Sequence, residues 1–266
     1  LLKIKTRSGR EIKSTKYHPF FVLKDGKVVA AKAEELKKGV RIAVPREINF
    51  EPENKYFTEL FDLITLQENI YVPYREDFIN ILKSMKEDYT WEQLCVKIGV
   101  SYYVIKGLID KQAIQFNHLI KILRYAKLKD MEIADLIYEV RANGKNTRFT
   151  FKNSPEFSRF FGYLLAEGRL AKSSHIWFTN GDREIVDDYV NLVRKLFNKE
   201  PLVAEYKPNC WDVIIYSEPL KKILGKLGMA SKTERKEISN IILKHSGNEE
   251  IAHLLNGLYC GDGYVS

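Results

Sequence analysis

The sequence predicts a multi-domain α+β protein made of three successive segments. Residues 1–46 contain short apolar runs separated by turn-forming residues, a pattern typical of an all-β module. Residues 47–147 are rich in Glu, Leu, Ile and Lys at helical spacing. From about residue 148 onwards helix-length and strand-length runs mix, and one short motif occurs twice. These changes of pattern place the predicted domain boundaries near residues 46 and 147.

The first segment is predicted to contain a β-hairpin. Its turn is Lys24-Asp25-Gly26-Lys27, because an Asp-Gly pair favours a tight two-residue connection. This turn joins the apolar run 20–23 to the run 28–30. Gly39 is expected to end a short helical turn over residues 33–38, and a last strand is expected over residues 41–44.

The second segment is predicted to be helical and to carry a helix-turn-helix. Thr90 is a suitable N-cap for a helix over 91–98, Gly99 ends that helix, and Ser101 caps a second helix over 102–109. Helix, glycine turn and helix together outline a DNA-reading motif within residues 90–110. An ordinary pair of packed helices is the alternative. If the motif binds DNA, the candidate contact residues are Lys97, Tyr102, Tyr103, Lys106 and Lys111.

The third segment is predicted to be α+β and to begin with a helix. Ser154-Pro155-Glu156 opens this helix, with proline at its first position. The apolar pattern that follows predicts the element order α-β-α-β-β-α up to residue 227. The polar stretch 141–146 is expected to be a turn-rich linker between the second and third segments.

The repeated motif predicts two helices that pack closely together. Its copies are residues 161–168, FGYLLAEG, and residues 256–263, NGLYCGDG. In each copy two small residues lie four positions apart, on one helix face. Small residues at this spacing let two helix backbones approach each other closely. The closing glycines are expected to end their helices in a left-handed conformation.

Each copy of the motif also places one acid at a helix C-terminus, Glu167 in the first and Asp262 in the second. This is an unfavourable position for a carboxylate, because the helix dipole is already negative there. Two such ends side by side repel each other, and a bound divalent cation relieves that repulsion. Carboxylate oxygens suit Mg²⁺ or Mn²⁺, so both acids are candidate metal ligands and catalytic residues for phosphodiester hydrolysis.

These paired motifs resemble those of LAGLIDADG, or DOD-type, homing endonucleases, over residues 149–266. The resemblance implies an αββαββα-like endonuclease half followed by the start of a second half. It also implies that Glu167 and Asp262 bind the metal ions that cut double-stranded DNA. Residues 236–242 resemble a further block of the family, with Ser239 in place of the usual proline. The matching lysine, Lys236, is then a catalytic residue that positions water or stabilises charge.

Residues 15–21, TKYHPFF, resemble the T-x-x-H block of archaeal-type inteins, and residues 39–46 resemble the stretch that follows it. Val40 replaces the aspartate of that stretch. The resemblance implies that residues 1–46 are the last part of the first segment of a β-rich Hint splicing module. His18 and Thr15 are then the residues that activate the peptide bond before the intein. The implied partners are the flanking host-protein segments, the exteins.

The sequence further predicts that this chain is a fragment of an intein. No N-terminal Cys or Ser nucleophile, terminal His-Asn pair or second endonuclease half is visible, so we expect this segment alone not to splice. We expect the complete protein to be a monomer. A catalytically inactive DNA-binding regulator and a decayed intein remain as alternatives, although a regulator tends to lose the acids.

Composition agrees with a nucleic-acid partner and excludes some classes. Lys and Arg outnumber Asp and Glu by 43 to 35, which favours an anionic partner such as DNA. The three cysteines form no C-x-x-C pair, which fits the reducing cytoplasm and indicates neither a zinc site nor a disulfide framework. No apolar run is long enough to span a membrane, so no membrane partner is expected. The charge-rich composition is weakly thermophile-like.

Overall fold

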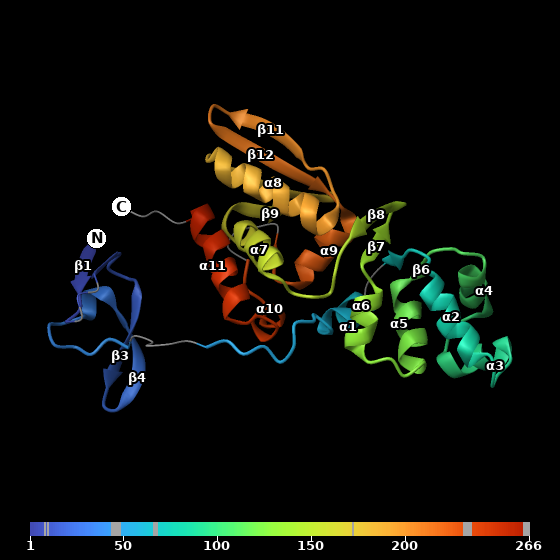
Figure 1. The fold of residues 1–266 in the computed structure, drawn as a ribbon. Helices are drawn as coiled ribbons and strands as arrows, with labels where there is room; N and C mark the ends of the chain where they lie inside the picture. The colour runs from blue at the N-terminus through green and yellow to red at the C-terminus, as the bar shows by residue number, and fades with distance from the viewer. Residues whose placement is uncertain are drawn as a thin grey trace. The chain divides into compact units, whose positions relative to one another are not determined.

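The computed structural model describes residues 1–262 apart from 8, 10, 44–48, 66–68, 172 and 231–235. The chain forms two compact units, Leu1–Asn49 and Phe50–Ser266 (Figure 1). Both units combine helical and strand structure, so the chain is a mixed α+β protein, as predicted. No helix in the described ranges is long and apolar enough to cross a membrane.

The first unit is built from two β-hairpins. Strand β1 (Leu2–Lys5) pairs with β2 (Glu11–Ser14), and β3 (Pro19–Lys24) pairs with β4 (Lys27–Lys32), both antiparallel. The predicted Asp-Gly turn is confirmed, since φ is 51° at Asp25 and 76° at Gly26.

The remaining predictions for the first unit are met in part. The expected helical turn is the 3₁₀ helix η1 (Ala33–Glu35). Gly39 has a φ of +92°, a left-handed value that suits a residue ending a turn. The strand expected over 41–44 is reduced to a single bridge between Ile42 and Val22. The last residue of that predicted strand, Val44, lies outside the described residues.

The second unit begins with a mainly helical part, residues 50–153. Its elements are, in order, α1 (Glu59–Thr65), β5 (Tyr71–Val72), α2 (Glu76–Met85), α3 (Trp91–Ile98), α4 (Tyr102–Ile109), β6 (Ile114–Gln115), α5 (Phe116–Tyr125), α6 (Asp130–Leu136), β7 (Glu139–Ala142) and β8 (Lys145–Arg148). The four short strands form one sheet in the order β6-β5-β7-β8. Helices α3 and α4 have the bounds that the sequence predicts.

The prediction of a linker over residues 141–146 is wrong. These residues belong to the hairpin β7–β8, whose turn is formed by Asn143 and Gly144 at φ of 51° and 76°. Asn-Gly is a strong hairpin signal when it lies between strands. The strands were overlooked because they are only four residues long and their outward side chains are polar.

The rest of the second unit combines long helices with a second sheet. Its elements are α7 (Pro155–Glu167), β9 (Gly168–Leu170), β10 (His175–Asn180), α8 (Arg183–Phe197), β11 (Leu202–Lys207), β12 (Cys210–Tyr216), α9 (Glu218–Lys226), α10 (Asn240–Lys244) and α11 (Asn248–Asp262). The sheet is antiparallel in the order β11-β12-β10-β9. From α7 to α9 the order is α-β-β-α-β-β-α, which adds the short strand β9 to the order predicted from residue patterns.

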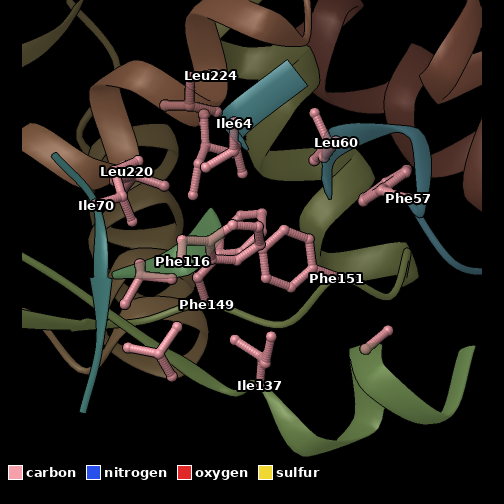
Figure 2. Close-up of a cluster of buried hydrophobic side chains, with 14 of the residues drawn as sticks. Phe57, Leu60, Ile64, Ile70, Phe116, Ile137, Phe149, Phe151, Leu220 and Leu224 are labelled. Carbon is pink, nitrogen blue, oxygen red and sulfur yellow. The ribbon is translucent and has the colours of Figure 1, made fainter. Parts of the chain in front are cut away.

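One hydrophobic core joins the two parts of the second unit. Figure 2 shows Phe116, Phe149 and Phe151 at its centre, with side chains from α1 and α9 around them. The rings of Phe149 and Phe151 lie 5.1 Å apart in an edge-to-face arrangement, the geometry that aromatic pairs prefer. The predicted division near residue 147 therefore separates parts that share a core, rather than compact units.

Candidate functional site

The two motif helices, α7 and α11, pack against each other over most of their length (Figure 1). A methyl group placed on Gly162 would lie 2.2 Å from the carbonyl oxygen of Leu254 on the other helix. A methyl on Gly257 would lie 2.3 Å from the carbonyl oxygen of Arg159. Neither position leaves space for a side chain. The close backbone approach predicted from the repeated small residues is therefore confirmed.

This close contact continues to the ends of both helices. Gly261 faces Ala166, since a methyl on Gly261 would lie 2.3 Å from the Ala166 Cβ atom and 3.8 Å from the Cγ atom of Glu167. Glu167 is the last residue of α7 and its side chain is exposed. Asp262 is the last residue of α11, but its side chain lies outside the described residues. The backbones of the two helix ends thus come together.

Gly168 does not have the expected left-handed conformation. Its φ is −90° and its ψ is 162°, so the chain leaves α7 directly into strand β9. Glycine is required there by close approach instead, because a Cβ atom would lie 2.7 Å from the carbonyl oxygen of Leu164. The closing glycine of the second motif, Gly263, lies outside the described residues.

Lys236 lies at the C-terminal end of α7. Its Nζ atom donates hydrogen bonds to the carbonyl oxygens of Leu164, Ala166 and Gly168 at 3.2, 2.9 and 3.1 Å. A cation at this position offsets the negative end of the helix dipole, and it adds a hydrogen-bond donor for the Ala166 carbonyl in the last turn of α7. Lys236 therefore fixes the backbone that carries Glu167.

Ser239, which stands where the family block has proline, has a clear local role. It is the N-cap of α10, and its hydroxyl oxygen accepts a hydrogen bond from the N–H of Ile242 at 3.4 Å. Serine is a favoured N-cap residue. The replacement is thus compatible with a helix start at this point.

A second polar network holds α7 against α8. The Tyr163 hydroxyl donates to the Asp188 carboxylate at 2.9 Å, and the Arg159 guanidinium contacts the same carboxylate at 2.9 Å. Burial, together with the hydrogen bond to Asp188, raises the pKa of Tyr163 to about 12, and this outweighs the opposing effect of Arg159. Tyr163 therefore stays protonated near neutral pH and keeps donating this hydrogen bond.

Buried polar contacts also anchor the end of α10 and the first turn of α11. The Glu250 carboxylate is 1% exposed and contacts the Lys55 Nζ atom at 2.7 Å. The His245 ring, also 1% exposed, lies 2.7 Å from the Glu59 carboxylate. Sequence reasoning missed these residues, because each partner lies 186 or 195 positions away and no local motif marks them.

The donor set at the helix ends suits a hard cation in its chemistry, since carboxylates are the ligands that Mg²⁺ and Mn²⁺ prefer. Across the described ranges, no group of three or more His, Cys, Asp or Glu side chains is arranged to hold a metal ion. The Asp262 carboxylate lies outside the described residues. Glu167 is therefore the one described side chain of the predicted pair of metal ligands.

Helices α3 and α4 form with the predicted Thr90 cap and Gly99 turn, whereas Ser101 lies at the N-cap position of α4 without a side-chain capping hydrogen bond. Thr90 accepts a hydrogen bond from the N–H of Gln93 at 3.3 Å, and Gly99 ends α3 at a φ of 74°. On α4, Tyr102 and Tyr103 are 46% and 82% exposed, and Lys106 is exposed beside them. These three candidate contact residues share one short, solvent-facing helix.

The two other candidate DNA contacts flank this helix. The Lys97 Nζ atom lies over the Tyr89 ring, 4.8 Å from its centre, so its side chain is partly positioned. Lys111 follows α4 in a left-handed conformation at a φ of 58°.

Thr15 and His18 occupy one turn of the first unit. The His18 N–H donates to the Thr15 carbonyl oxygen at 3.2 Å, and the His18 carbonyl oxygen accepts from the Ala33 N–H at 2.8 Å. Both side chains are exposed, and the His18 ring meets the Phe20 ring at 5.2 Å. The turn brings the two residues together and leaves their side chains accessible.

Taken together, these features define a chain with a β-rich module and a close helix pair that ends in acids. Comparison with known proteins identifies the family, because the model of the intein splicing domain matches residues 1–254. The chain belongs to the intein splicing domain family.

The curated relatives have unrelated names. The chain is 28% identical to the DNA-directed RNA polymerase subunit Rpo1C of Methanocaldococcus jannaschii, over 100% of the chain and 23% of the relative. It is 22% identical to a DNA polymerase of Thermococcus sp. strain GE8, over 98% of the chain and 18% of the relative. Over 17% of the chain it is 55% identical to the replication factor C small subunit of Thermococcus kodakarensis, covering 5% of that protein. The chain thus spans less than a third of each of these relatives.

Proposed function

We propose that this chain carries the first half, and the start of the second half, of a LAGLIDADG-type homing endonuclease within an intein, and that the complete protein hydrolyses both strands of duplex DNA with Mg²⁺ or Mn²⁺. The observation that carries this proposal is the close contact of α7 and α11. Each helix ends in an acid, and Gly261 lies against Ala166 and next to Glu167. Helix ends packed in this way bring two carboxylate-bearing residues together at one point.

The range of relatives supports an inserted module. An RNA polymerase subunit, a DNA polymerase and a replication factor have different names and tasks, yet each contains a segment similar to this chain. A segment shared among such different proteins is expected of an intein, which splices itself out of its host. Its partners are then the flanking host segments and the DNA site that it cuts.

Within the endonuclease, Glu167 and Asp262 hold the metal ions. A bound divalent cation supplies Lewis acidity and lowers the pKa of water, which is the chemistry that phosphodiester hydrolysis needs. Lys236 acts as a positioning residue, because its three hydrogen bonds fix the end of α7 beside Glu167. The two motif helices lie in one chain, so the complete protein acts as a monomer.

DNA binding is assigned to the helical part of the second unit. Helix α4 presents Tyr102, Tyr103 and Lys106 to solvent, and Lys97 and Lys111 flank it. The lysines contact phosphates, while a tyrosine reaches into a groove. This surface supplies affinity and register, and the helix ends supply the chemistry.

Splicing chemistry is assigned to the first unit. In the complete precursor, the accessible His18 donates a proton to the scissile peptide nitrogen, and Thr15 holds the geometry. Replacing His18 with Ala in that precursor should block N-terminal cleavage, as measured by gel analysis of spliced products. Unchanged splicing would remove this role from His18.

The test of the endonuclease is cleavage of duplex DNA that contains the uninterrupted insertion site. The full-length wild type should cut both strands with Mg²⁺ and not without it. Glu167→Gln should lose cleavage of both strands while still binding DNA, because the variant keeps its shape but removes one negative charge. The control is Glu184→Gln, an exposed acid on α8. No cleavage by the wild type would favour the regulator or the decayed intein, and undiminished cleavage by Glu167→Gln would exclude that residue as a metal ligand.

A further inference from the structure

A crevice lies in the second unit, between the hairpin β7–β8 and the C-terminal end of α8. Its volume is about 440 Å³, and it is lined by Tyr138, Glu139, Arg148 and Asn198. Strand β8 packs against α8. Asn198 ends that helix in a left-handed conformation at a φ of 49°. The crevice therefore has walls from two elements that the shared core holds in place.

Three cations lie in or beside this crevice, and Arg148 is the one among its lining residues. Arg148 and Lys145 are exposed on β8, and Lys199 is half-buried immediately after Asn198. Burial, and then the charge of Lys145, lower the pKa of Lys199. Among the residues that the structure describes, no carboxylate forms an ion pair with any of these three side chains.

The nearby carboxylates offset these cations only in part. Glu139 lines the crevice as the cross-strand partner of Arg148, and its charge opposes the lowering of the Lys199 pKa. Glu139 accepts a hydrogen bond from the Asn146 amide at 3.2 Å, and Glu200 pairs with Arg194 at 2.8 Å. The cations thus outnumber the acids that face the crevice. Such a grouping of like charges costs stability unless an anion from outside the chain joins it.

We propose that this crevice is a phosphate subsite for the backbone of duplex DNA, an inference that rests on the DNA binding proposed above. Arg148, Lys145 and Lys199 supply the charge, and the Asn198 amide and the Tyr138 hydroxyl can donate hydrogen bonds. The Tyr138 ring is held by the Arg75 guanidinium, which lies 4.3 Å from the ring centre.

DNA is the occupant that the fold favours. The hairpin β7–β8 belongs to the same four-stranded sheet as β6, the strand that directly follows the exposed helix α4. One sheet therefore carries both the candidate DNA-reading helix and the basic hairpin. A duplex bound at α4 presents a regular series of phosphates that a second contact on the same sheet can use.

The experiment measures binding of fluorescent duplex DNA to the full-length protein between 50 and 200 mM salt. Lys199→Gln and Arg148→Gln should each weaken binding and reduce the slope of log K against log salt by about 0.9, the value for one lost phosphate contact. Glu139→Gln should have the opposite effect and tighten binding, because it removes a carboxylate that repels phosphate. Lys27→Gln, an exposed lysine at the β3–β4 turn, controls for the loss of one charge.

The outcomes separate this subsite from the proposed function. A wild type that binds no DNA contradicts DNA binding as a whole. A wild type that binds, with all crevice variants matching Lys27→Gln in affinity and slope, overturns the subsite alone. Thermal melting shows whether each variant is still folded. Lys199→Gln removes like-charge repulsion, so its Tm should be no lower than that of the wild type. Weaker binding by a variant of unchanged stability supports the subsite.

Discussion

The glycines of the motif helices set how closely α7 and α11 can pack, and Gly257→Ala tests this directly. The added methyl would lie 2.3 Å from the Arg159 carbonyl oxygen and 3.0 Å from the Tyr163 nitrogen. Both neighbours are backbone atoms, so no side-chain rotation can relieve the overlap. The two helices must move apart, and their ends must separate with them.

The magnitude follows from two opposing effects. Alanine is favoured over glycine in a helix interior by about 1 kcal/mol. Overpacking costs about 1–3 kcal/mol, and the upper end applies here because backbone meets backbone. The net result is a loss of about 2 kcal/mol in the free energy of unfolding. For a unit of this size that corresponds to a fall in Tm of roughly 4–8 °C.

The matched control is Gly225→Ala on α9. There the nearest atom to the added methyl is the Leu170 Cδ1 atom at 3.8 Å, an ordinary contact. This variant should be as stable as the wild type, or more stable by up to about 1 kcal/mol. Thermal melting of both variants decides the matter. Equal stability of Gly257→Ala and Gly225→Ala would refute the packing argument.

Three further predictions concern the parts around the helix pair. Thr90→Ala removes the side-chain cap of α3 and should lower the stability of that helix by about 1 kcal/mol. The loss should appear as faster amide hydrogen exchange in α3, and unchanged exchange would contradict the capping role. Lys236→Met removes three hydrogen bonds at the end of α7 and should lower the free energy of unfolding by about 2 kcal/mol, measured by urea unfolding. A loss near zero would argue against the positioning role of Lys236. Burial opposes the ionisation of Glu250, but the hydrogen bonds from Lys55 and backbone N–H groups outweigh it and lower the Glu250 pKa. Its stabilisation is therefore present above the ordinary glutamate pKa of 4.5 and is lost as pH falls through the lowered value, so Glu250→Gln should flatten the acid side of a Tm-against-pH curve.

Local sequence signals predicted the helices that have clear capping residues or a glycine at their ends. Thr90 and Gly99 gave the bounds of α3, because capping and left-handed glycine act within a few residues. Ser101 marked the start of α4 correctly, but its side chain does not make the expected capping hydrogen bond. The repeated small residues likewise predicted the contact of α7 with α11, since backbone approach depends only on side-chain size and helical spacing.

Features that depend on distant partners were not predictable in this way. The hairpin β7–β8 was taken for a linker because its strands are short, and its role in a sheet depends on β5. Gly168 was expected to be left-handed, yet strand β9 pairs with β10 and draws the chain into an extended conformation. The Glu250–Lys55 pair joins residues 195 positions apart, and no local pattern signals it.

The central claim is that Glu167 and Asp262 share a cation site at the paired helix ends. Its most direct test is Mn²⁺ binding to the full-length protein in complex with target DNA, with the bound Mn²⁺ measured by electron paramagnetic resonance. The wild type should retain bound Mn²⁺, and both Glu167→Gln and Asp262→Asn should lose it while still binding DNA. Retention of the same amount of Mn²⁺ by both variants would contradict the shared site.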